Sequence, residues 1–258
     1  MSDYSILDQP ELCQYLFYPR RAFDLPPAGA FDVLVPVDQG IVISCRFFQG
    51  GGDWPWIIYF HGNGEVASDY NDIAPFYLSC SINLVVADYR GYGASTGIPG
   101  FAHLIKDAHV LYQTLQDKIR EINPSLVPIY LMGRSLGSTS ALELAAHYQD
   151  HIAGLIIESG FASVTRLIKH LNLPGYTMPM DDLEDACLDM IGGITCPSLI
   201  IHGEYDNLVP QQEGELVYHT LSSREKKFIR VPGASHNDIM FVRPDLYFSA
   251  LQAFVHPK

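Results

Sequence analysis

Basic residues are scarce in this 258-residue chain, which has 16 lysines and arginines against 29 aspartates and glutamates and a formal net charge of −13 at pH 7. A protein with this charge repels phosphate backbones and anionic lipid. No stretch of the chain gathers its few lysines and arginines into a basic patch. We therefore do not expect nucleic acid as a partner.

Long hydrophobic runs are also missing. No stretch approaches the roughly 20 apolar residues that a transmembrane helix needs, so we expect no integral membrane segment. The first 20 residues carry Asp3, Asp8 and Glu11, where a secretory signal needs a basic start followed by an unbroken apolar run. The sequence alone therefore predicts a cytoplasmic protein.

Cysteines are few, odd in number and scattered along the chain. Their spacing shows neither the close pairs of a zinc site nor the regular pattern of a disulfide framework. The five are Cys13, Cys45, Cys80, Cys187 and Cys196. We expect them to be reduced thiols.

What the chain has in abundance is apolar sequence, at 48% of its residues, in runs that alternate between strand-like and helix-like patterns. The length suits one domain spanning residues 1–258. Strands are expected at 31–37, 41–48, 54–60, 82–87, 127–132, 152–157, 198–201 and 227–231. Helices are expected at about 66–80, with an interruption at Pro75, and at 101–122, 136–148, 211–221 and 245–255. This order predicts an α/β fold with a mostly parallel, about eight-stranded sheet, an antiparallel N-terminal hairpin and helices on both faces.

The stretch Gly133-Arg134-Ser135-Leu136-Gly137 joins an expected strand to an expected helix. A serine with glycine two residues away on either side, in this position, is typical of a nucleophile elbow. The turn is so tight that larger flanking side chains would clash, and it projects the serine oxygen beyond the strand. Ser135 is therefore predicted to be a catalytic nucleophile.

A serine nucleophile needs a histidine to accept its proton and a carboxylate to orient that histidine. His236 follows the last expected strand and Asp206 follows the strand at 198–201, so both are expected at the edge of the sheet where ligands bind. Glu158, at the end of another strand, is an alternative acid, although a carboxylate there more often braces a loop. His61 and His202 also follow strands, and we expect them to bond loop backbone rather than transfer protons.

Acyl transfer also requires hydrogen-bond donors for the oxyanion. The backbone N–H of Leu136, directly after the nucleophile, is one candidate, since it opens a helix whose dipole favours negative charge. The backbone N–H of Asn63, in the glycine-flanked loop His61-Gly62-Asn63-Gly64, is the other.

Together these motifs resemble the α/β-hydrolase superfamily, and within it the Bem46-like group, which includes protein depalmitoylases of the ABHD type. The stretches that carry the resemblance are Phe60-His61-Gly62-Asn63-Gly64, Asp88-Tyr89-Arg90-Gly91-Tyr92-Gly93-Ala94-Ser95, the elbow, His202-Gly203 with Asp206, and residues 233–238. The resemblance implies a Ser135-Asp206-His236 triad that needs no cofactor and no metal. This chain shows no cysteine-rich N-terminus of the kind that places eukaryotic relatives on membranes, which argues against protein depalmitoylation.

The predicted function is hydrolysis of a small-molecule carboxylic ester or thioester through an acyl-enzyme. Two alternatives stay open at this point, a peptidase of the prolyl-peptidase type and a non-catalytic scaffold that only binds. The segment 160–196 combines apolar residues, among them Leu171, Tyr176 and Met178, with an acidic run at 181–189. It is either a small lid over Ser135, which would favour short to medium uncharged acyl groups, or an ordinary crossover helix.

Overall fold

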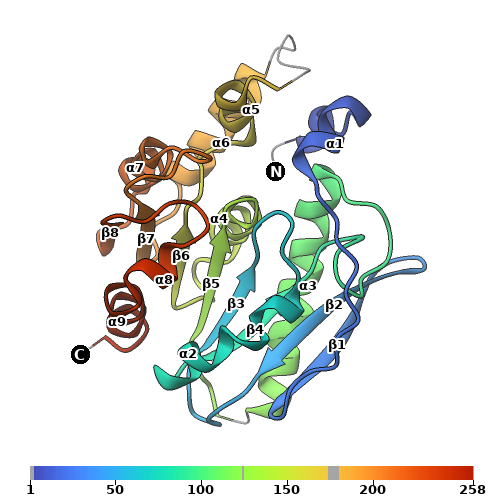
Figure 1. Ribbon diagram of the computed structural model, residues 1–258, viewed down its shortest axis with the longest axis vertical. Helices are drawn as coiled ribbons and strands as arrows, with labels where there is room; N and C mark the ends of the chain where they lie inside the picture. Colours follow the sequence, from blue (N-terminus) through green and yellow to red (C-terminus); the bar gives the residue numbers. More distant parts are fainter. Residues whose placement is uncertain (1–2, 124, 174–179, 258) are drawn as a thin grey trace.

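In the computed structural model, which describes residues 3–123, 125–173 and 180–257, eight strands form one sheet in the order β1-β2-β4-β3-β5-β6-β7-β8 (Figure 1). Strand β2 pairs antiparallel with β1 and β4, and the other neighbours pair parallel. The strands are β1 (Ala30–Asp38), β2 (Ile41–Phe48), β3 (Trp56–Phe60), β4 (Asn83–Ala87), β5 (Ile129–Arg134), β6 (Gly154–Glu158), β7 (Ser198–Gly203) and β8 (Lys226–Val231). The predicted fold class and the antiparallel hairpin are confirmed.

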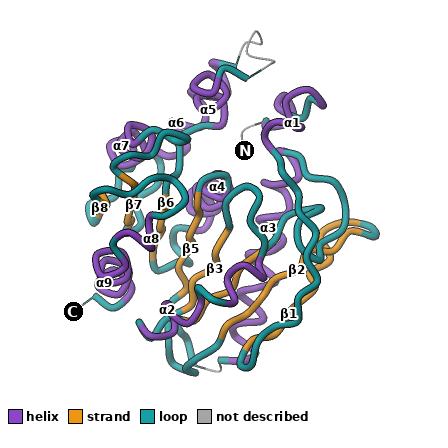
Figure 2. The backbone as a smooth tube through the Cα atoms, viewed as in Figure 1, coloured by secondary structure: helices purple, strands orange, loops and turns teal. Residues whose placement is uncertain are grey.

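Helices cover both faces of this sheet (Figures 1 and 2). The helices are η1 (Tyr4–Leu7), α1 (Pro10–Leu16), η2 (Ala67–Asn71), α2 (Ala74–Ser79), α3 (Phe101–Ile122), α4 (Gly137–Tyr148), α5 (Val164–Leu171), α6 (Asp181–Gly192), α7 (Gln211–Thr220), α8 (Ile239–Val242) and α9 (Pro244–Val255). Side chains of α3, α4, α6 and α7 pack with the N-terminal helices on one face, and those of α2, α8 and α9 pack on the other.

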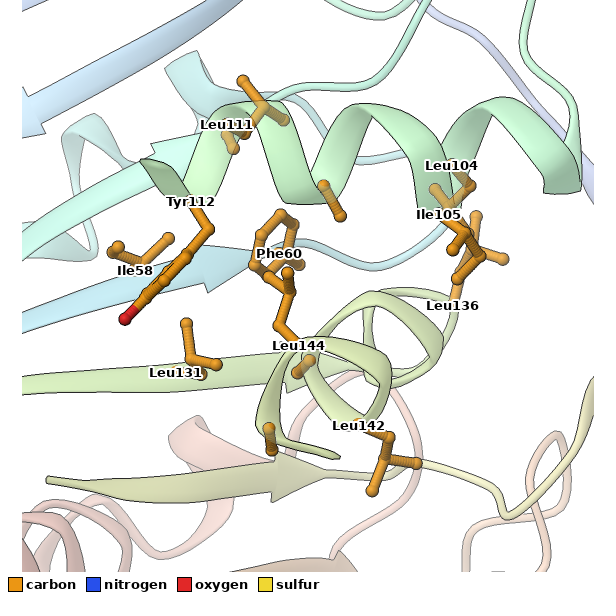
Figure 3. Close-up of a cluster of buried hydrophobic side chains, with 14 of the residues drawn as sticks. Ile58, Phe60, Leu104, Ile105, Leu111, Tyr112, Leu131, Leu136, Leu142 and Leu144 are labelled. Carbon is orange, nitrogen blue, oxygen red and sulfur yellow. The ribbon is translucent and has the colours of Figure 1, made fainter. Parts of the chain in front are cut away.

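Strand β3 shows how the central strands supply both cores. Because successive side chains of a strand point to opposite faces, Ile58 and Phe60 pack with α3 and α4, while Ile57 and Tyr59 pack on the opposite face. Figure 3 shows the first of these cores, in which Phe60 lies between α3 and α4. A strand buried on both faces reads as a continuous apolar run, which is why the sequence indicates it so clearly.

The helix predicted at 66–80 is interrupted, as expected, but the break lies at residues 72–73 and not at Pro75. The structure has a short 3-10 helix, η2, followed by the separate helix α2. Pro75 lies in the first turn of α2, where an N–H has no intrahelical acceptor in any case. The proline therefore starts a helix rather than interrupting one.

The segment 160–196 follows β6 and folds as two helices, α5 and α6, with residues 174–179 between them outside the described part of the chain. Tyr176 and Met178, which the sequence suggests as lid residues, fall in that gap. Across the residues that the structure describes, no helix is both long enough and apolar enough to span a bilayer.

Candidate active site

Ser135 lies on a sharp turn between β5 and α4. Its φ is 50°, in the left-handed region that a residue with a side chain rarely adopts. A side chain at Gly133 would clash with the backbone of Ser138, and one at Gly137 would clash with the carbonyl oxygen of Phe60. Both glycines are thus required by the close approach of backbone segments, as a nucleophile elbow demands.

The structure brings Ser135, His236 and Asp206 together in one hydrogen-bonded row. The three residues come from the loops after β5, β8 and β7. His236 Nε2 lies 3.0 Å from Ser135 Oγ, and His236 Nδ1 lies 2.7 Å from Asp206 Oδ2. All three are nearly buried, with exposed fractions of 7%, 6% and 5% for the serine, histidine and aspartate. A proton can therefore pass from Ser135 to His236 while Asp206 holds the opposite side of the ring.

The surroundings of Asp206 favour its ionised form. Burial alone would raise its pKa, but hydrogen bonds from His202 and His236 outweigh burial and hold the pKa below its usual value. The other carboxylate oxygen accepts the backbone N–H groups of Leu208, at 3.1 Å, and Val209, at 2.8 Å. His202 is closer to this site than the sequence suggests, since its Nε2 lies 3.4 Å from Asp206 Oδ2 as well as 2.8 Å from the carbonyl oxygen of Val209.

Glu158, the alternative acid, is fully buried in a different network. Its carboxylate accepts hydrogen bonds from Arg134 Nε at 3.1 Å and from the hydroxyl of Tyr247 at 2.5 Å. Arg134 also pairs with Glu65 and donates to the carbonyl oxygen of His236 at 2.8 Å. The structure therefore places Asp206, not Glu158, against the ring of His236.

Arg134 is a residue of the site to which the sequence motifs assign no role. Arg134 and Glu158 are the last residues of neighbouring strands and are partners in the register of β5 and β6. A signal was present, because a buried acid at a strand end requires a cation, and Arg134 ends the strand that carries the nucleophile.

The loop from His61 to Gly64 is held in place by the chain on both sides of it. The hydroxyl of Tyr89 donates to the carbonyl oxygen of His61 at 2.6 Å. His61 Nδ1 lies 2.8 Å from the carbonyl oxygen of Gly62. Asn63 Oδ1 accepts from the backbone N–H of Tyr18 at 2.9 Å and from the hydroxyl of Tyr92 at 2.6 Å. The N-terminal arm and the loop after β4 thus fix the position of Asn63.

A cavity of about 410 Å³ opens above Ser135 and His236. Leu136 and Asn63, the predicted oxyanion-hole residues, line it as well. Neither backbone N–H has a protein acceptor among the hydrogen bonds of the described residues. Their role in binding an oxyanion stays a prediction.

Most of the cavity wall is apolar and comes from two segments distant in sequence. The N-terminal arm contributes aromatic and leucine side chains, and α5 with the residues after it contributes the opposite side. The apolar lining residues are Tyr15, Leu16, Tyr18, Phe101, Leu136, Phe161, Val164, Leu167, Leu171, Leu173, Leu208 and Val209. Among the described lining residues there is no aspartate or glutamate. The cavity thus suits an uncharged, apolar group.

Within the described part of the chain, only one group of three side chains has potential metal-ligand atoms close together. The group is His109, Glu143 and His147, on α3 and α4. None of these residues lines the cavity above Ser135.

Comparisons with known proteins agree with the fold. Residues 55–179 match the family model described as serine aminopeptidase, S33. The chain is 31% identical over 207 residues to protein bem46 of Schizosaccharomyces pombe, covering 78% of this chain and 67% of that protein. It is 31% identical over 182 residues to lysophosphatidylserine lipase ABHD12 of Danio rerio, covering 64% of this chain and 46% of the relative. The solved structure of the Pyrococcus furiosus esterase Pf2001 superposes with a TM-score of 0.73 at 20% identity, covering 92% of this chain and 97% of the esterase, and so shows the same fold.

Proposed function

The chain belongs to the Bem46-like group of the α/β-hydrolase superfamily, and from this premise we propose that it is a serine hydrolase that cleaves carboxylic esters or thioesters. The observation that carries the proposal is the row of Ser135, His236 and Asp206, with contacts of 3.0 Å and 2.7 Å, at the base of an apolar cavity. In this proposal Ser135 is the nucleophile, His236 the general base and acid, and Asp206 the group that orients His236.

In the acylation half-reaction, Ser135 Oγ forms a bond to the carbonyl carbon of the substrate while its proton moves to His236 Nε2. Asp206 accepts the Nδ1–H of His236 and stabilises the imidazolium that forms. The bond from the carbonyl carbon to the leaving oxygen or sulfur then breaks, and His236 gives its proton to that atom. The product is an acyl-Ser135 ester and a free alcohol or thiol.

Deacylation repeats these steps with water. His236 takes a proton from the water, whose oxygen attacks the acyl carbon, and Ser135 leaves as it regains a proton. In both halves the carbonyl oxygen becomes negatively charged, and the backbone N–H groups of Leu136 and Asn63 are the donors that we assign to it. Loss of one such donor typically costs about 10²–10³ in rate.

The wall of the cavity favours an acyl ester over the peptide that the name of the matching family model suggests. An aminopeptidase must hold the charged amino group of its substrate, and a buried ammonium requires an acidic or densely polar partner. Among the described residues that line the cavity, Arg134 is the only arginine or lysine, and it is already paired with Glu65 and Glu158. We therefore assign an uncharged acyl group to the apolar wall.

Labelling with a fluorophosphonate probe tests the proposal, because the probe reacts only with an activated serine. We expect the parent to react with the probe and to hydrolyse an activated ester. The hydrolysis rates of Ser135→Ala and His236→Ala should be thousands of times lower than that of the parent, since triad members act as a unit. Ser140→Ala is the matched control, because it removes a buried hydroxyl without a hydrogen-bond partner among the described residues. Activity above a few per cent in purified Ser135→Ala would remove Ser135 from the role of nucleophile.

A further inference from the structure

Glu143, in the middle of α4, is a buried carboxylate that the proposed mechanism does not use. Its side chain is fully buried, and neither carboxylate oxygen accepts a hydrogen bond from any described residue. An isolated charge in such a place is costly, so its surroundings should supply a cation.

Two imidazoles face this carboxylate, one from each of two packed helices. His147 lies one helical turn after Glu143 on α4, and its Nδ1 is 3.5 Å from Glu143 Oε1 and 2.9 Å from the backbone carbonyl oxygen of Glu143. His109 comes from α3, and its Nε2 is 3.8 Å from Glu143 Oε1. Both distances to Oε1 are too long for hydrogen bonds, and His109 Nε2 has no hydrogen-bond partner among the described residues.

The distances of 3.5 Å and 3.8 Å from Glu143 Oε1 to the two imidazole nitrogens are slightly longer than the edge of a coordination shell. Zinc–nitrogen and zinc–oxygen bonds of about 2.0–2.1 Å at tetrahedral angles put neighbouring ligand atoms about 3.4 Å apart. One ligand atom from each of His109, Glu143 and His147 lies within 4.8 Å of the other two. An ion between them would require shifts of about an ångström from side chains of which two are partly exposed, and His147 Nδ1 would exchange its hydrogen bond to the Glu143 carbonyl oxygen for a bond to the metal.

The outer contacts of His109 are also those of a metal ligand. Its Nδ1 lies 3.1 Å from the hydroxyl of Tyr148, which also accepts from Gln113 Nε2 at 3.4 Å. A ligating histidine usually engages its second nitrogen in this way, which fixes the ring and directs the other nitrogen to the metal. Here the other nitrogen, Nε2, faces Glu143.

We propose that His109, Glu143 and His147 bind a Zn²⁺ ion that joins α3 to α4. Two imidazoles and one carboxylate suit zinc among the common biological cations, and the exposed edge of His147 leaves a fourth position for water. The ion neutralises Glu143 and holds α4, the helix that begins at the end of the nucleophile elbow, against α3. It takes no part in acyl transfer, so the proposal stands independently of the proposed function.

The test is zinc binding by the tag-free full-length chain after its metal has been stripped with a chelator. Calorimetric titration with Zn²⁺ gives stoichiometry and affinity, and the visible spectrum with Co²⁺ reports tetrahedral coordination. Glu143→Gln and His147→Gln remove ligands. His151→Gln is the matched control, because it removes another exposed histidine four residues further along, and His236→Ala excludes an ion held by the triad.

We expect one Zn²⁺ per chain in the parent, in His151→Gln and in His236→Ala, and at least about tenfold weaker binding in Glu143→Gln and His147→Gln. Zinc should raise the melting temperature of the parent more at pH 8 than at pH 6, because protons compete for imidazole nitrogens. Metal-free Glu143→Gln should melt no lower than the metal-free parent, since no hydrogen bond is lost. Absence of a stoichiometric site in the parent, or equal affinity in parent and ligand variants, would overturn the proposal. So would a metal-free Glu143→Gln that melts well below the parent, because Glu143 would then be satisfied by protonated histidines.

Discussion

Replacing each of two acids by its amide separates the carboxylate that we assign to catalysis from the one that supports the fold. In Asp206→Asn the amide oxygen can still accept the backbone N–H groups of Leu208 and Val209, so the loop after β7 should keep its shape. The amide nitrogen would then face His236 Nδ1, where a donor replaces an acceptor, and the ring would be held in the wrong tautomer. Such a change lowers kcat by about 10⁴, or about 5.4 kcal/mol of transition-state stabilisation.

Glu158→Gln should give the opposite pattern. The substitution removes a fully buried charge that pairs with Arg134, but Arg134 keeps Glu65 and the amide oxygen can still accept one hydrogen bond. The cost should thus lie near the low end of the range for a broken buried pair, at about 3 kcal/mol. For a chain of this length that corresponds to a fall in melting temperature of about 6–12 °C. Glu158 affects His236 only through Arg134, so kcat should fall by no more than about tenfold.

The assay measures kcat on an activated ester together with the melting temperature, for parent and both variants, using one preparation of each. A large loss of rate in Glu158→Gln together with a small loss in Asp206→Asn would assign the orienting role to Glu158. Equal losses of both rate and stability would mean that the two networks act as one, and the separation argued from the structure would be wrong.

The remaining predictions concern the cavity wall, the elbow and pH. Leu171→Asp should raise KM for long acyl esters more than for acetyl esters, by about fourfold for each methylene that loses apolar contact. The control Leu126→Asp, at a site 94% exposed, should leave both KM values unchanged. Equal effects of Leu171→Asp on all chain lengths would place α5 away from the substrate. Gly137→Ala should lower the melting temperature sharply, because its new methyl group meets the carbonyl oxygen of Phe60, and a variant that melts like the parent would contradict that contact. The pKa of Asp206 is lowered in the folded protein, so its contribution to stability is complete above about pH 5 and is lost as the pH falls below about 4. Between pH 6 and pH 3 the melting temperature should therefore fall less in Asp206→Asn than in the parent. If the melting temperature falls equally in both, the ionised carboxylate is not stabilised by folding.

Most of the fold was accessible from the sequence because its signals are local. A parallel strand buried on both faces reads as a run of apolar residues, as in β3, and the clash that requires glycine at Gly133 is with Gly137 and Ser138 of the same turn. The order of Ser135, Asp206 and His236 along the chain, each after a strand, was enough to predict that they meet at one edge of the sheet. At Pro75 the sequence is ambiguous, because a proline favours a helix start as much as it opposes a helix interior, and the structure has the helix start.

Only the tertiary structure could decide which groups touch. Asp206 follows β7 and Glu158 ends β6, and the choice between them depends on where the loop after β8 carries His236. The lining of the cavity joins the N-terminal arm to α5, and the cluster around Glu143 joins α3 to α4. The sequence by itself therefore determined the elements, their order and the edge at which chemistry can occur, because these follow from periodicity and local sterics. The partners of each buried charge and the shape of the cavity depend on contacts between distant segments, and folding alone sets those.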